Sequence, residues 1–265
     1  MADDKGRARN PLVAKLSQFA QLSDQDVRLL ETLCLHKERL RGGANIVVEG
    51  ETPRSAFVLT RGMACRFRLM PDGRRQILTI LIPGDFCDLH GFLLKATDHS
   101  ITAIGPTRLA AIGREAVIDM IANHPRIGAA LWWSALQEEA MLRERIVALG
   151  RRSARGRVAY ILCELVWRQR AVGMAEDHAI RLPFTQTDLA DMLGLTSVHT
   201  NRVLQGFRRD ELITLEHRRL TLHDLERLRA ISGLSKDYLQ LNSTPPEVLR
   251  YFDGLERDRG GPGAK

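Results

Sequence analysis

Five side chains suited to the major groove of DNA follow a glycine in the C-terminal half of the chain. Gly194 divides the stretch DLADMLGLTSVHTNRVL, residues 188–204, into two short amphipathic segments. In the second segment, side chains spaced three and four apart share one helical face, and these are Ser197, Val198, Asn201, Arg202 and Gln205. Arginine can donate a fork of hydrogen bonds to guanine, asparagine or glutamine can pair with adenine, and an apolar side chain can contact the thymine methyl group. The pattern predicts a surface that reads base pairs; the alternative is a solvated helix face in a protein-interaction domain.

Polar and basic residues around this face are placed to contact phosphates, which fix the register of a protein on DNA without reading its sequence. The predicted phosphate contacts are Thr187, His199, Arg218 and Arg219, with His217 in the same basic turn. The chain has 265 residues, a net charge of +7 and a pI of about 9.6. Residues 151–219 hold 12 Arg, no Lys and 8 Asp or Glu, an excess of four positive charges. This distribution favours an anionic partner such as double-stranded DNA.

The residues next to this face predict two helices joined by a tight turn. Thr185 can cap the first helix with Asp188 at the reciprocal position, and Thr196 can cap the second. Gly194 can adopt the left-handed conformation that ends a helix. The buried sides are predicted at Leu189, Ala190, Leu193, Leu195, Val203, Leu204 and Phe207. Two alternating strands around residues 216–219 and a short helix at 225–233 complete the outline of a winged helix-turn-helix.

The N-terminal half has a different pattern of apolar residues. Residues 11–35 show helical spacing of apolar residues, with Ser23 and Asp26 as a capping box. Between residues 37 and 112, short apolar or alternating runs are separated by Gly and Pro, among them Gly62 and Gly105-Pro106. Such runs are typical of a β-sandwich or barrel. Pro71-Asp72-Gly73 predicts a hairpin turn, because each of its residues favours turn geometry.

A long helix is predicted to link the two halves. Helix formers dominate from residue 114 to residue 150. Six residues recur at alternating steps of three and four, which is typical of a coiled-coil seam; they are Leu131, Ala135, Glu138, Leu142, Arg145 and Leu149. The seam predicts a dimerisation helix, and the alternative is one helix packed on its own β domain.

Three stretches make the chain resemble the Crp/Fnr family of bacterial transcription regulators: IPGDFCDLHGFLL, RRSARGRVAYIL and TQTDLADMLGLTSVHTNRVLQGFRRDELI. The resemblance implies an α+β fold with an N-terminal cyclic-nucleotide-binding β-roll (jelly roll), a long dimerisation helix and a C-terminal winged helix-turn-helix. It also implies a sequence-specific regulator, not an enzyme, that binds palindromic promoter sites as a homodimer and contacts RNA polymerase. The expected divisions are an N-terminal segment 1–22, the β-roll 23–123, the dimerisation helix 124–150, the DNA-binding domain 151–232 and a peripheral tail 233–265.

The expected location is the cytoplasm. Residues 1–10 are polar and charged, which predicts disorder rather than a signal peptide. No apolar run reaches the roughly 18 to 20 residues of a membrane span. The four cysteines, Cys34, Cys65, Cys87 and Cys163, are scattered without a metal-binding spacing, so reduced thiols and no structural metal are expected.

The β-roll departs from the family members that bind cyclic AMP. Their Gly-Glu pair, whose Glu holds the ribose, aligns with Asp88-Leu89, and their Arg-Ser/Thr pair for the phosphate aligns with His99-Ser100. Leucine cannot replace the carboxylate, and a histidine offers no bidentate fork and is mostly neutral at pH 7. The iron–sulfur branch needs several N-terminal cysteines, whereas Cys34 stands alone. The sequence therefore argues against both cofactors, and Asp88, Leu89, His99 and Ser100 remain candidates for another effector pocket.

Other sensing mechanisms stay open. A thiol switch at Cys163 or Cys87 requires a lowered pKa, and a haem ligand would have to come from His36, His90 or His99, among which nothing selects. A metal-dependent oxygenase needs two histidines and a carboxylate, which only His90, His99 and Asp88 or Asp98 could supply. A nucleotide-binding module without a DNA role conflicts with Leu89 and His99. Regulation by expression level alone is the remaining alternative.

The recognition helix also departs from its better-known relatives. Those relatives carry a Glu, a small residue three positions later and an Arg four positions later. The corresponding residues here are Val198, Asn201 and Arg202. A carboxylate can accept a hydrogen bond from cytosine N4, and valine cannot. The sequence predicts a half-site that keeps a guanine for Arg202 and differs at the base pair that the missing Glu would read.

Overall fold

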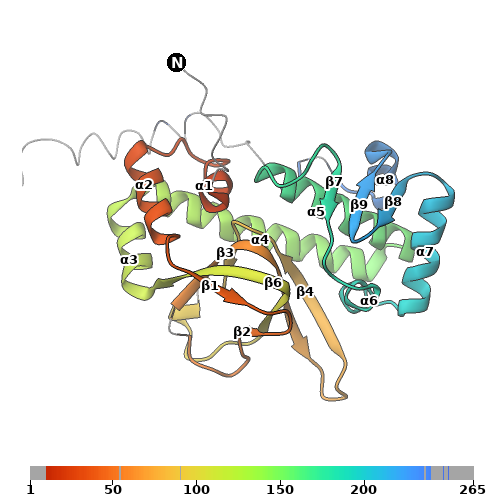
Figure 1. Cartoon of the computed structure of the whole chain (residues 1–265), viewed down its shortest axis with the longest axis horizontal. Helices are drawn as coiled ribbons and strands as arrows, with labels where there is room; N and C mark the ends of the chain where they lie inside the picture. Colours follow the sequence, from red (N-terminus) through yellow and green to blue (C-terminus); the bar gives the residue numbers. More distant parts are fainter. Residues whose placement is uncertain are drawn as a thin grey trace, which may run out of the picture.

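The computed structural model describes residues 10–239 apart from Arg54, His90 and Lys236, together with Glu247 and Arg250. Two short helices lead into an antiparallel sheet, a long helix runs past this sheet, and helices with a second small sheet follow (Figure 1). This is the predicted α+β fold. The disorder predicted for residues 1–10 lies, Asn10 apart, outside the described residues, as does most of the tail.

Two short helices precede the sheet, α1 (Pro11–Leu16) and α2 (Asp24–Leu33). The predicted capping box is present: Ser23 Oγ accepts from Asp26 N, and the Asp26 carboxylate accepts from Ser23 N at 2.9 Å. Leu12 and Leu16 are fully buried. The helical spacing of apolar residues therefore marks a face that packs on the β-roll.

The β-roll consists of β1 (Lys37–Leu40), β2 (Asn45–Val47), β3 (Ser55–Leu69), β4 (Arg75–Leu81), β5 (Phe86–Cys87) and β6 (Ser100–Gly113), with a short 3-10 helix η1 (Gly91–Leu93). The strand order is β1-β6-β3-β4, with β2 paired to β6 and β5 to β3. The predicted turn joins β3 to β4. There Asp72 Oδ1 accepts from Arg74 N at 3.0 Å, and Gly73 has a φ of 82°.

Two predicted strand breaks are wrong. β3 runs through Gly62 and β6 runs through Gly105-Pro106, so each is one long strand with a shift in register. Gly62 has a φ of 84°, and a Cβ there would lie 2.5 Å from the Pro106 carbonyl oxygen. Glycine is needed at this position because two backbones approach closely at a bulge, not because the chain turns.

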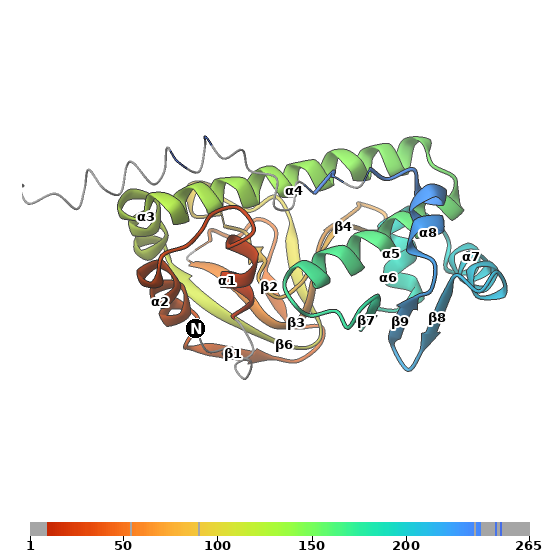
Figure 2. The same cartoon turned by 90° about the horizontal axis from the view of Figure 1, so that it is seen from above.

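Helix α3 (Arg114–Asn123) leads into the long helix α4 (Pro125–Arg151). Figure 2 shows α4 running past both the β-roll and the C-terminal helices. One side of α4 is buried within the chain: Leu131 is 2% exposed and Arg145 is 4% exposed. A single α4 is therefore packed on its own chain along one side.

The predicted coiled-coil seam does not form one exposed row. Leu131 and Arg145 of that seam are buried within the chain, Ala135, Glu138 and Leu149 are half-buried, and Leu142 is 41% exposed. Moving the same alternating steps by one residue gives an exposed row, which is Trp132, Leu136, Glu139, Arg143 and Ile146. Apolar residues occupy both faces of α4, so the spacing alone does not tell which row packs inside the chain.

The C-terminal part contains α5 (Ala154–Ala171), β7 (Ala179–Arg181), α6 (Gln186–Leu193), α7 (Ser197–Arg209), β8 (Ile213–Glu216), β9 (Arg219–Leu222) and α8 (Leu225–Ser232). The small sheet has the order β7-β9-β8. This is the predicted winged helix-turn-helix, with α6 and α7 as the helix pair and the β8–β9 hairpin as the wing.

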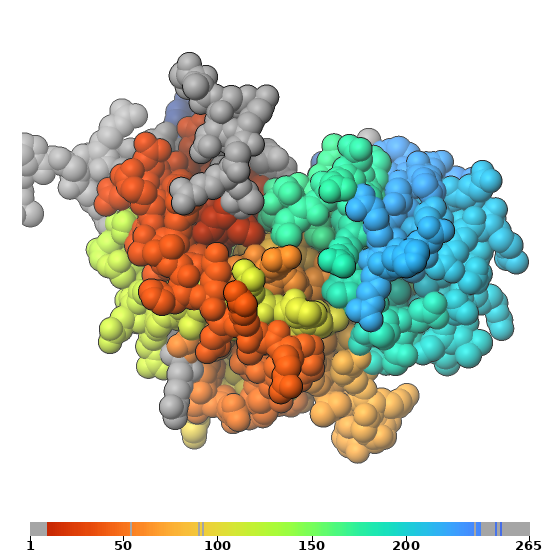
Figure 3. Space-filling model, viewed as in Figure 1, coloured from red at the N-terminus to blue at the C-terminus, as the bar shows by residue number. Residues whose placement is uncertain are grey.

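The β-roll and the C-terminal part share one apolar core. Ile77 and Ile80 of β4 belong to the same buried cluster as Leu162 of α5 and Leu193 of α6. The two parts accordingly lie against each other in the space-filling view (Figure 3). Among the described residues, no helix combines the length and apolar character needed to cross a membrane.

Candidate nucleic-acid interface

Helices α6 and α7 meet at the turn that the sequence places at Gly194. Gly194 has φ and ψ of 60° and 39°, the left-handed conformation. Thr185 Oγ1 accepts from Asp188 N, and the Asp188 carboxylate accepts from Thr185 N at 2.7 Å, so the predicted capping box is present. Thr196 Oγ1 accepts from His199 N at 3.2 Å. These caps satisfy backbone N–H groups that helix starts leave free, and they define where both helices begin.

One side of α7 packs into the domain. Leu204, Phe207 and Thr200 are completely buried, and Ala190 of α6 is 3% exposed where the helices cross. The Arg155 guanidinium lies 4.5 Å from the centre of the Phe207 ring, a cation–π contact. Of the α7 residues predicted to be buried, Leu204 and Phe207 are buried and Val203 is half-buried, while the opposite side faces solvent.

The exposed side of α7 carries the side chains predicted to read bases. Val198 is 71% exposed, and Arg202 and Gln205 are exposed as well. His199, a predicted phosphate contact, is exposed beside them. No hydrogen bond within the described part of the chain occupies the Arg202 guanidinium, so it is free to donate to a ligand.

Ser197 and Asn201 are half-buried because they contact α6. Ser197 Oγ lies 3.4 Å from Thr187 Oγ1, and Gln186 Nε2 donates to Asn201 Oδ1 at 3.3 Å. Both residues remain on the face with Arg202, but their polar groups are partly held by the first helix. The sequence does not predict the contact with Gln186, because it joins residues on two different helices.

The wing presents Arg218 at its tip. His217 and Arg218 have φ values of 48° and 62°, as the two-residue turn of a tight hairpin requires. The Arg218 carbonyl accepts from Leu182 N at 2.8 Å, while its side chain is exposed. Arg219 instead donates to Glu176 Oε2 at 2.7 Å. Arg218 is therefore available to a phosphate, and Arg219 would have to leave an exposed ion pair.

The first pair of effector-pocket candidates lies directly after β5. Asp88 has a φ of 61°, a conformation that glycine favours. Its Oδ2 atom is buried without a hydrogen-bond partner among the described residues. Leu89 is 8% exposed. The backbone shape expected for the family's glycine is kept here by an aspartate, whereas the next side chain is an apolar core residue.

The second pair lies at the start of β6. His99 is 8% exposed, and its Nδ1 atom lies 2.8 Å from Asp98 Oδ1. Its Nε2 atom is buried without a partner among the described residues. Ser100 Oγ accepts from Glu49 N at 3.0 Å. The Ser100 hydroxyl is thus engaged in joining β6 to the segment after β2.

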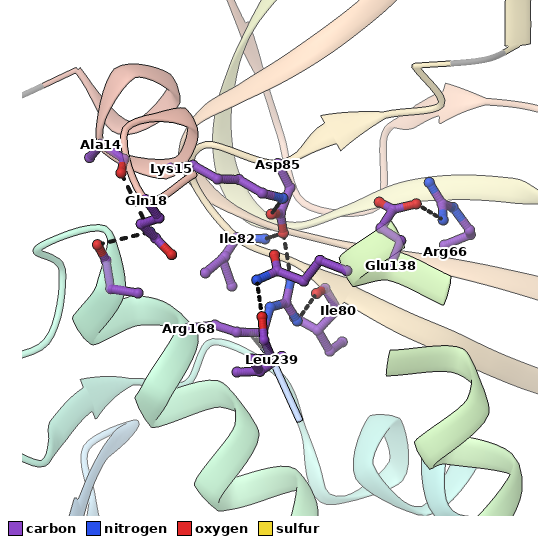
Figure 4. A network of polar contacts seen from close by, with 12 residues as sticks. Ala14, Lys15, Gln18, Arg66, Ile80, Ile82, Asp85, Glu138, Arg168 and Leu239 are labelled. Carbon is purple, nitrogen blue, oxygen red and sulfur yellow. Dashed lines mark hydrogen bonds and ion pairs between the residues drawn. The ribbon is translucent and has the colours of Figure 1, made fainter. Parts of the chain in front are cut away.

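An ion pair fills the space between the β-roll and α4. Arg66 of β3 donates from Nη1 to Glu138 Oε2 of α4 at 3.2 Å, as Figure 4 shows. The cavity beside it measures about 10 Å³, which is the lower limit for one water molecule. It is lined by Arg66, Leu78, Thr79, Glu138, Met141, Leu142 and Arg145. The sequence does not predict this pair, because its partners are 72 residues apart.

The structure does not favour a thiol switch. Cys87 and Cys163 are fully buried. Burial raises the pKa of each thiol to about 12, whereas a reactive thiol needs a lowered pKa and access to solvent. No group of three potential metal ligands occurs among the described residues; His90, a candidate for haem or metal binding, lies outside them.

Two family profiles match the chain. The profile described as a cyclic nucleotide-binding domain matches residues 37–124, and the one described as a Crp-like helix-turn-helix domain matches residues 156–231. These ranges coincide with the β-roll and the winged helix-turn-helix. The matches and the geometry thus point to the same two parts of the chain.

The chain is similar in sequence to two bacterial regulators and in fold to a solved structure. The transcriptional activator protein FnrL of Cereibacter sphaeroides is 28% identical over 82% of this chain and 88% of its own length. The nitrogen fixation regulation protein FixK of Bradyrhizobium diazoefficiens is 30% identical over 72% of this chain and 79% of its own length. The solved structure of FixK2 from Bradyrhizobium japonicum superposes with a TM-score of 0.66, at 24% identity, over 76% of this chain and 98% of that one.

Proposed function

Since this chain belongs to the Crp/Fnr family of DNA-binding transcription regulators, we infer that it binds a palindromic promoter site as a homodimer, with α7 of each subunit in the major groove. The exposed face of α7 carries this proposal. Val198, Arg202 and Gln205 are turned to solvent on a helix whose other side is packed and whose start is capped. A helix held in this way can enter the groove without rearranging.

The wing and the first helix would contribute contacts to the DNA backbone. Arg218, His199 and Thr187 are exposed around α7 and can donate hydrogen bonds to phosphate oxygens. Arg219 could join them by exchanging Glu176 for a phosphate, since a solvent-exposed ion pair contributes little stability. These contacts would set the position of α7, and Arg202 would supply sequence discrimination.

The exposed row on α4 supports the homodimer. Trp132 is 69% exposed, Leu136 is 46% exposed and Ile146 is 70% exposed. Glu139 and Arg143 lie between them and form an ion pair with each other. Large apolar side chains at heptad spacing on a long helix are stabilised by a second copy of that helix. Two copies would also present two recognition helices, as a palindrome requires.

We further propose that neither cyclic AMP nor an iron–sulfur cluster controls this protein. The cavity between the β-roll and α4 has no room for a nucleotide, because the Arg66–Glu138 pair occupies that space. Leu89 is buried where the ribose carboxylate would be needed, and Cys34 is a lone buried thiol. RNA polymerase as a partner, a cytoplasmic location and the absence of enzymatic activity are expected from the family.

The first experiment is a binding titration on a palindrome selected from random DNA. Neutralising phosphates releases counterions, so raising the salt concentration from 50 to 200 mM should weaken binding by roughly 100-fold or more. Cyclic AMP should leave the dissociation constant unchanged. Binding that is insensitive to salt would contradict a DNA reader, and tighter binding with cyclic AMP would contradict the effector proposal.

Replacing Arg202 by alanine should remove discrimination at one base pair of each half-site. The loss of a bidentate contact to guanine costs about 1 to 3 kcal/mol. Selection from random DNA should return a relaxed base at that position and an otherwise unchanged sequence. The matched control is Arg170→Ala, the same change of charge at an exposed residue at the end of α5. Uniform weakening on all sequences would mean that Arg202 contacts only phosphate.

The same selection tests the role of Val198. A valine cannot accept a hydrogen bond from cytosine, so the base pair that the missing Glu would read should differ from the one selected by relatives with Glu at this position. A consensus identical to theirs would show that Val198 does not determine specificity.

A further inference from the structure

Arg75, the first residue of β4, joins the β-roll to the first helix of the helix-turn-helix. Its Nη2 atom donates to Asp188 Oδ1 at 2.6 Å and to Asp191 Oδ2 at 2.9 Å, and its Nε atom donates to Asp191 Oδ2 at 3.1 Å. The Arg75 side chain is 28% exposed, and the two carboxylates are 16% and 26% exposed. Water therefore screens these contacts less than it would screen a surface ion pair.

The surrounding contacts keep the Arg75 guanidinium in place. It lies 5.7 Å from the centre of the Phe67 ring on β3. Gln76 Nε2 donates to the Met192 carbonyl at the end of α6 at 3.3 Å. Asp188 also completes the capping box of α6, whose N-cap is Thr185. Burial raises the pKa of Asp188, but hydrogen bonds from Thr185 and Arg75 outweigh this effect and leave the pKa below its usual value. Asp188 is thus charged at neutral pH, as the contact requires.

A second attachment holds α5 of the same domain. Arg168 donates from Nη2 to Asp85 Oδ2 at 2.5 Å and from Nη1 to the Ile80 carbonyl at 2.9 Å (Figure 4). Gln18 of α1 donates to the Ala171 carbonyl at the end of α5 at 3.1 Å. A body attached at one point can pivot, whereas attachments on two separate helices fix its orientation.

This attached arrangement leaves the reading face of α7 open. Val198, Arg202 and Gln205 are exposed while α6 is held by Arg75. An attachment that covered the face would inhibit binding, and this one does not cover it. The attachment therefore leaves the reading face accessible to DNA.

We propose that Arg75, by bridging Asp188 and Asp191, is a positioning residue that sets the orientation of the recognition helix relative to α4, and thereby the half-site spacing that the protein accepts. The proposal rests on the palindromic homodimer proposed above. The two recognition helices of a dimer must match the spacing of their half-sites. Loosening one attachment would let each helix-turn-helix adapt to other spacings and would add a cost of ordering to every binding event.

The test uses the full chain and three variants: Arg75→Ala, Asp191→Asn and Arg74→Ala. Arg74 is the matched control, because it is the neighbouring hairpin arginine, its side chain is 84% exposed, and its ion pair is with Asp72 in the turn. Dissociation constants are measured on the selected palindrome and on versions with one base pair inserted or removed at its centre. Thermal unfolding establishes that each variant is folded.

The expected result is the same for Arg75→Ala and Asp191→Asn. Both should weaken binding to the selected palindrome by about 3- to 10-fold, the range of long-range coupling mutations. The dissociation constant on DNA with altered spacing, divided by that on the selected palindrome, should be lower for both variants than for the wild type. Arg74→Ala should retain the wild-type ratio. Asp191→Asn makes the protein less negative, so electrostatics alone would strengthen binding. A loss of affinity with this variant would therefore show that the contact between Arg75 and Asp191 supports DNA binding.

Other results would overturn the proposal. If both variants keep the wild-type spacing ratio, Arg75 does not set the spacing. If Arg75→Ala lowers the salt dependence by about one phosphate contact and Asp191→Asn has no effect, Arg75 is a DNA contact. If both variants bind more tightly, the attachment is inhibitory. If the wild-type protein binds without any preference for spacing, the palindromic homodimer itself is wrong, and the role of Arg75 falls with it.

Discussion

Replacing Ile146 by aspartate is expected to make the protein monomeric and to weaken its binding to the selected palindrome by at least about 100-fold, because the second half-site then no longer binds as part of the same molecule. Ile146 is 70% exposed, so the change leaves the core of the subunit intact. In the dimer it would bury a charge in the row that includes Trp132 and Leu136, where Arg143 is already paired with Glu139. Sedimentation measures the molecular mass, and a titration measures the affinity.

A control separates the interface from a general effect of added negative charge. Leu35, between α2 and β1, is 68% exposed and is not part of α4. Leu35→Asp makes the same kind of change and should leave both mass and affinity near those of the wild type. An Ile146→Asp protein that is still dimeric would show that the exposed row is not the interface. A monomer with undiminished affinity would show that one recognition helix suffices.

Local signals account for the parts of the fold that the sequence predicts correctly. The turn at Gly194, the capping boxes at Ser23 and Thr185, and the hairpin at Asp72 depend on residues within four positions of each other. Conformation and hydrogen bonding at such sites are decided by nearby side chains. The exposed face of α7 follows from the same cause, because helical periodicity and a capped start determine which side chains point together.

Features that depend on packing between distant parts were not predicted. The exposed row of α4 has the predicted spacing, but which row is exposed depends on which side packs within the chain, as the burial of Leu131 shows. Gly62 was interpreted as a break because a bulge and a turn both favour glycine. The Arg66–Glu138 pair and the contacts of Arg75 with Asp188 join residues 72 and 113 positions apart. Such pairs leave no periodic trace in a single sequence.

Replacing Asp85 by asparagine should destabilise the protein by about 3 to 5 kcal/mol, the cost of removing one partner from a buried ion pair. Asp85 is 2% exposed. Its carboxylate accepts from Lys15 Nζ at 2.6 Å, from Arg168 Nη2 at 2.5 Å and from Ile82 N at 2.8 Å. An asparagine keeps the shape of the side chain but carries no charge. Lys15 therefore loses its counterion, and Arg168 keeps Glu164 as its remaining counterion.

The effect of Asp85→Asn on stability should depend on pH. Burial raises the pKa of Asp85, but the charges of Lys15 and Arg168 outweigh this effect and hold the pKa below its usual value. A carboxyl group whose pKa is lowered by folding stabilises the folded state above its unfolded pKa of about 3.9, and the contribution is lost as the pH falls through the lowered value. Urea unfolding at pH 7 and in this acidic range should therefore show a difference between wild type and Asp85→Asn that shrinks with acidity.

The matched control is Asp72→Asn, the same substitution at a half-exposed residue of the hairpin turn. It should change the free energy of unfolding by no more than about 0.5 kcal/mol. Equal stability of Asp85→Asn and Asp72→Asn would contradict the anchoring role of Asp85. Because Asp85 and Arg75 attach different helices of the same domain, losing the first should destabilise the whole chain, whereas losing the second should mainly alter the spacing of the DNA half-sites.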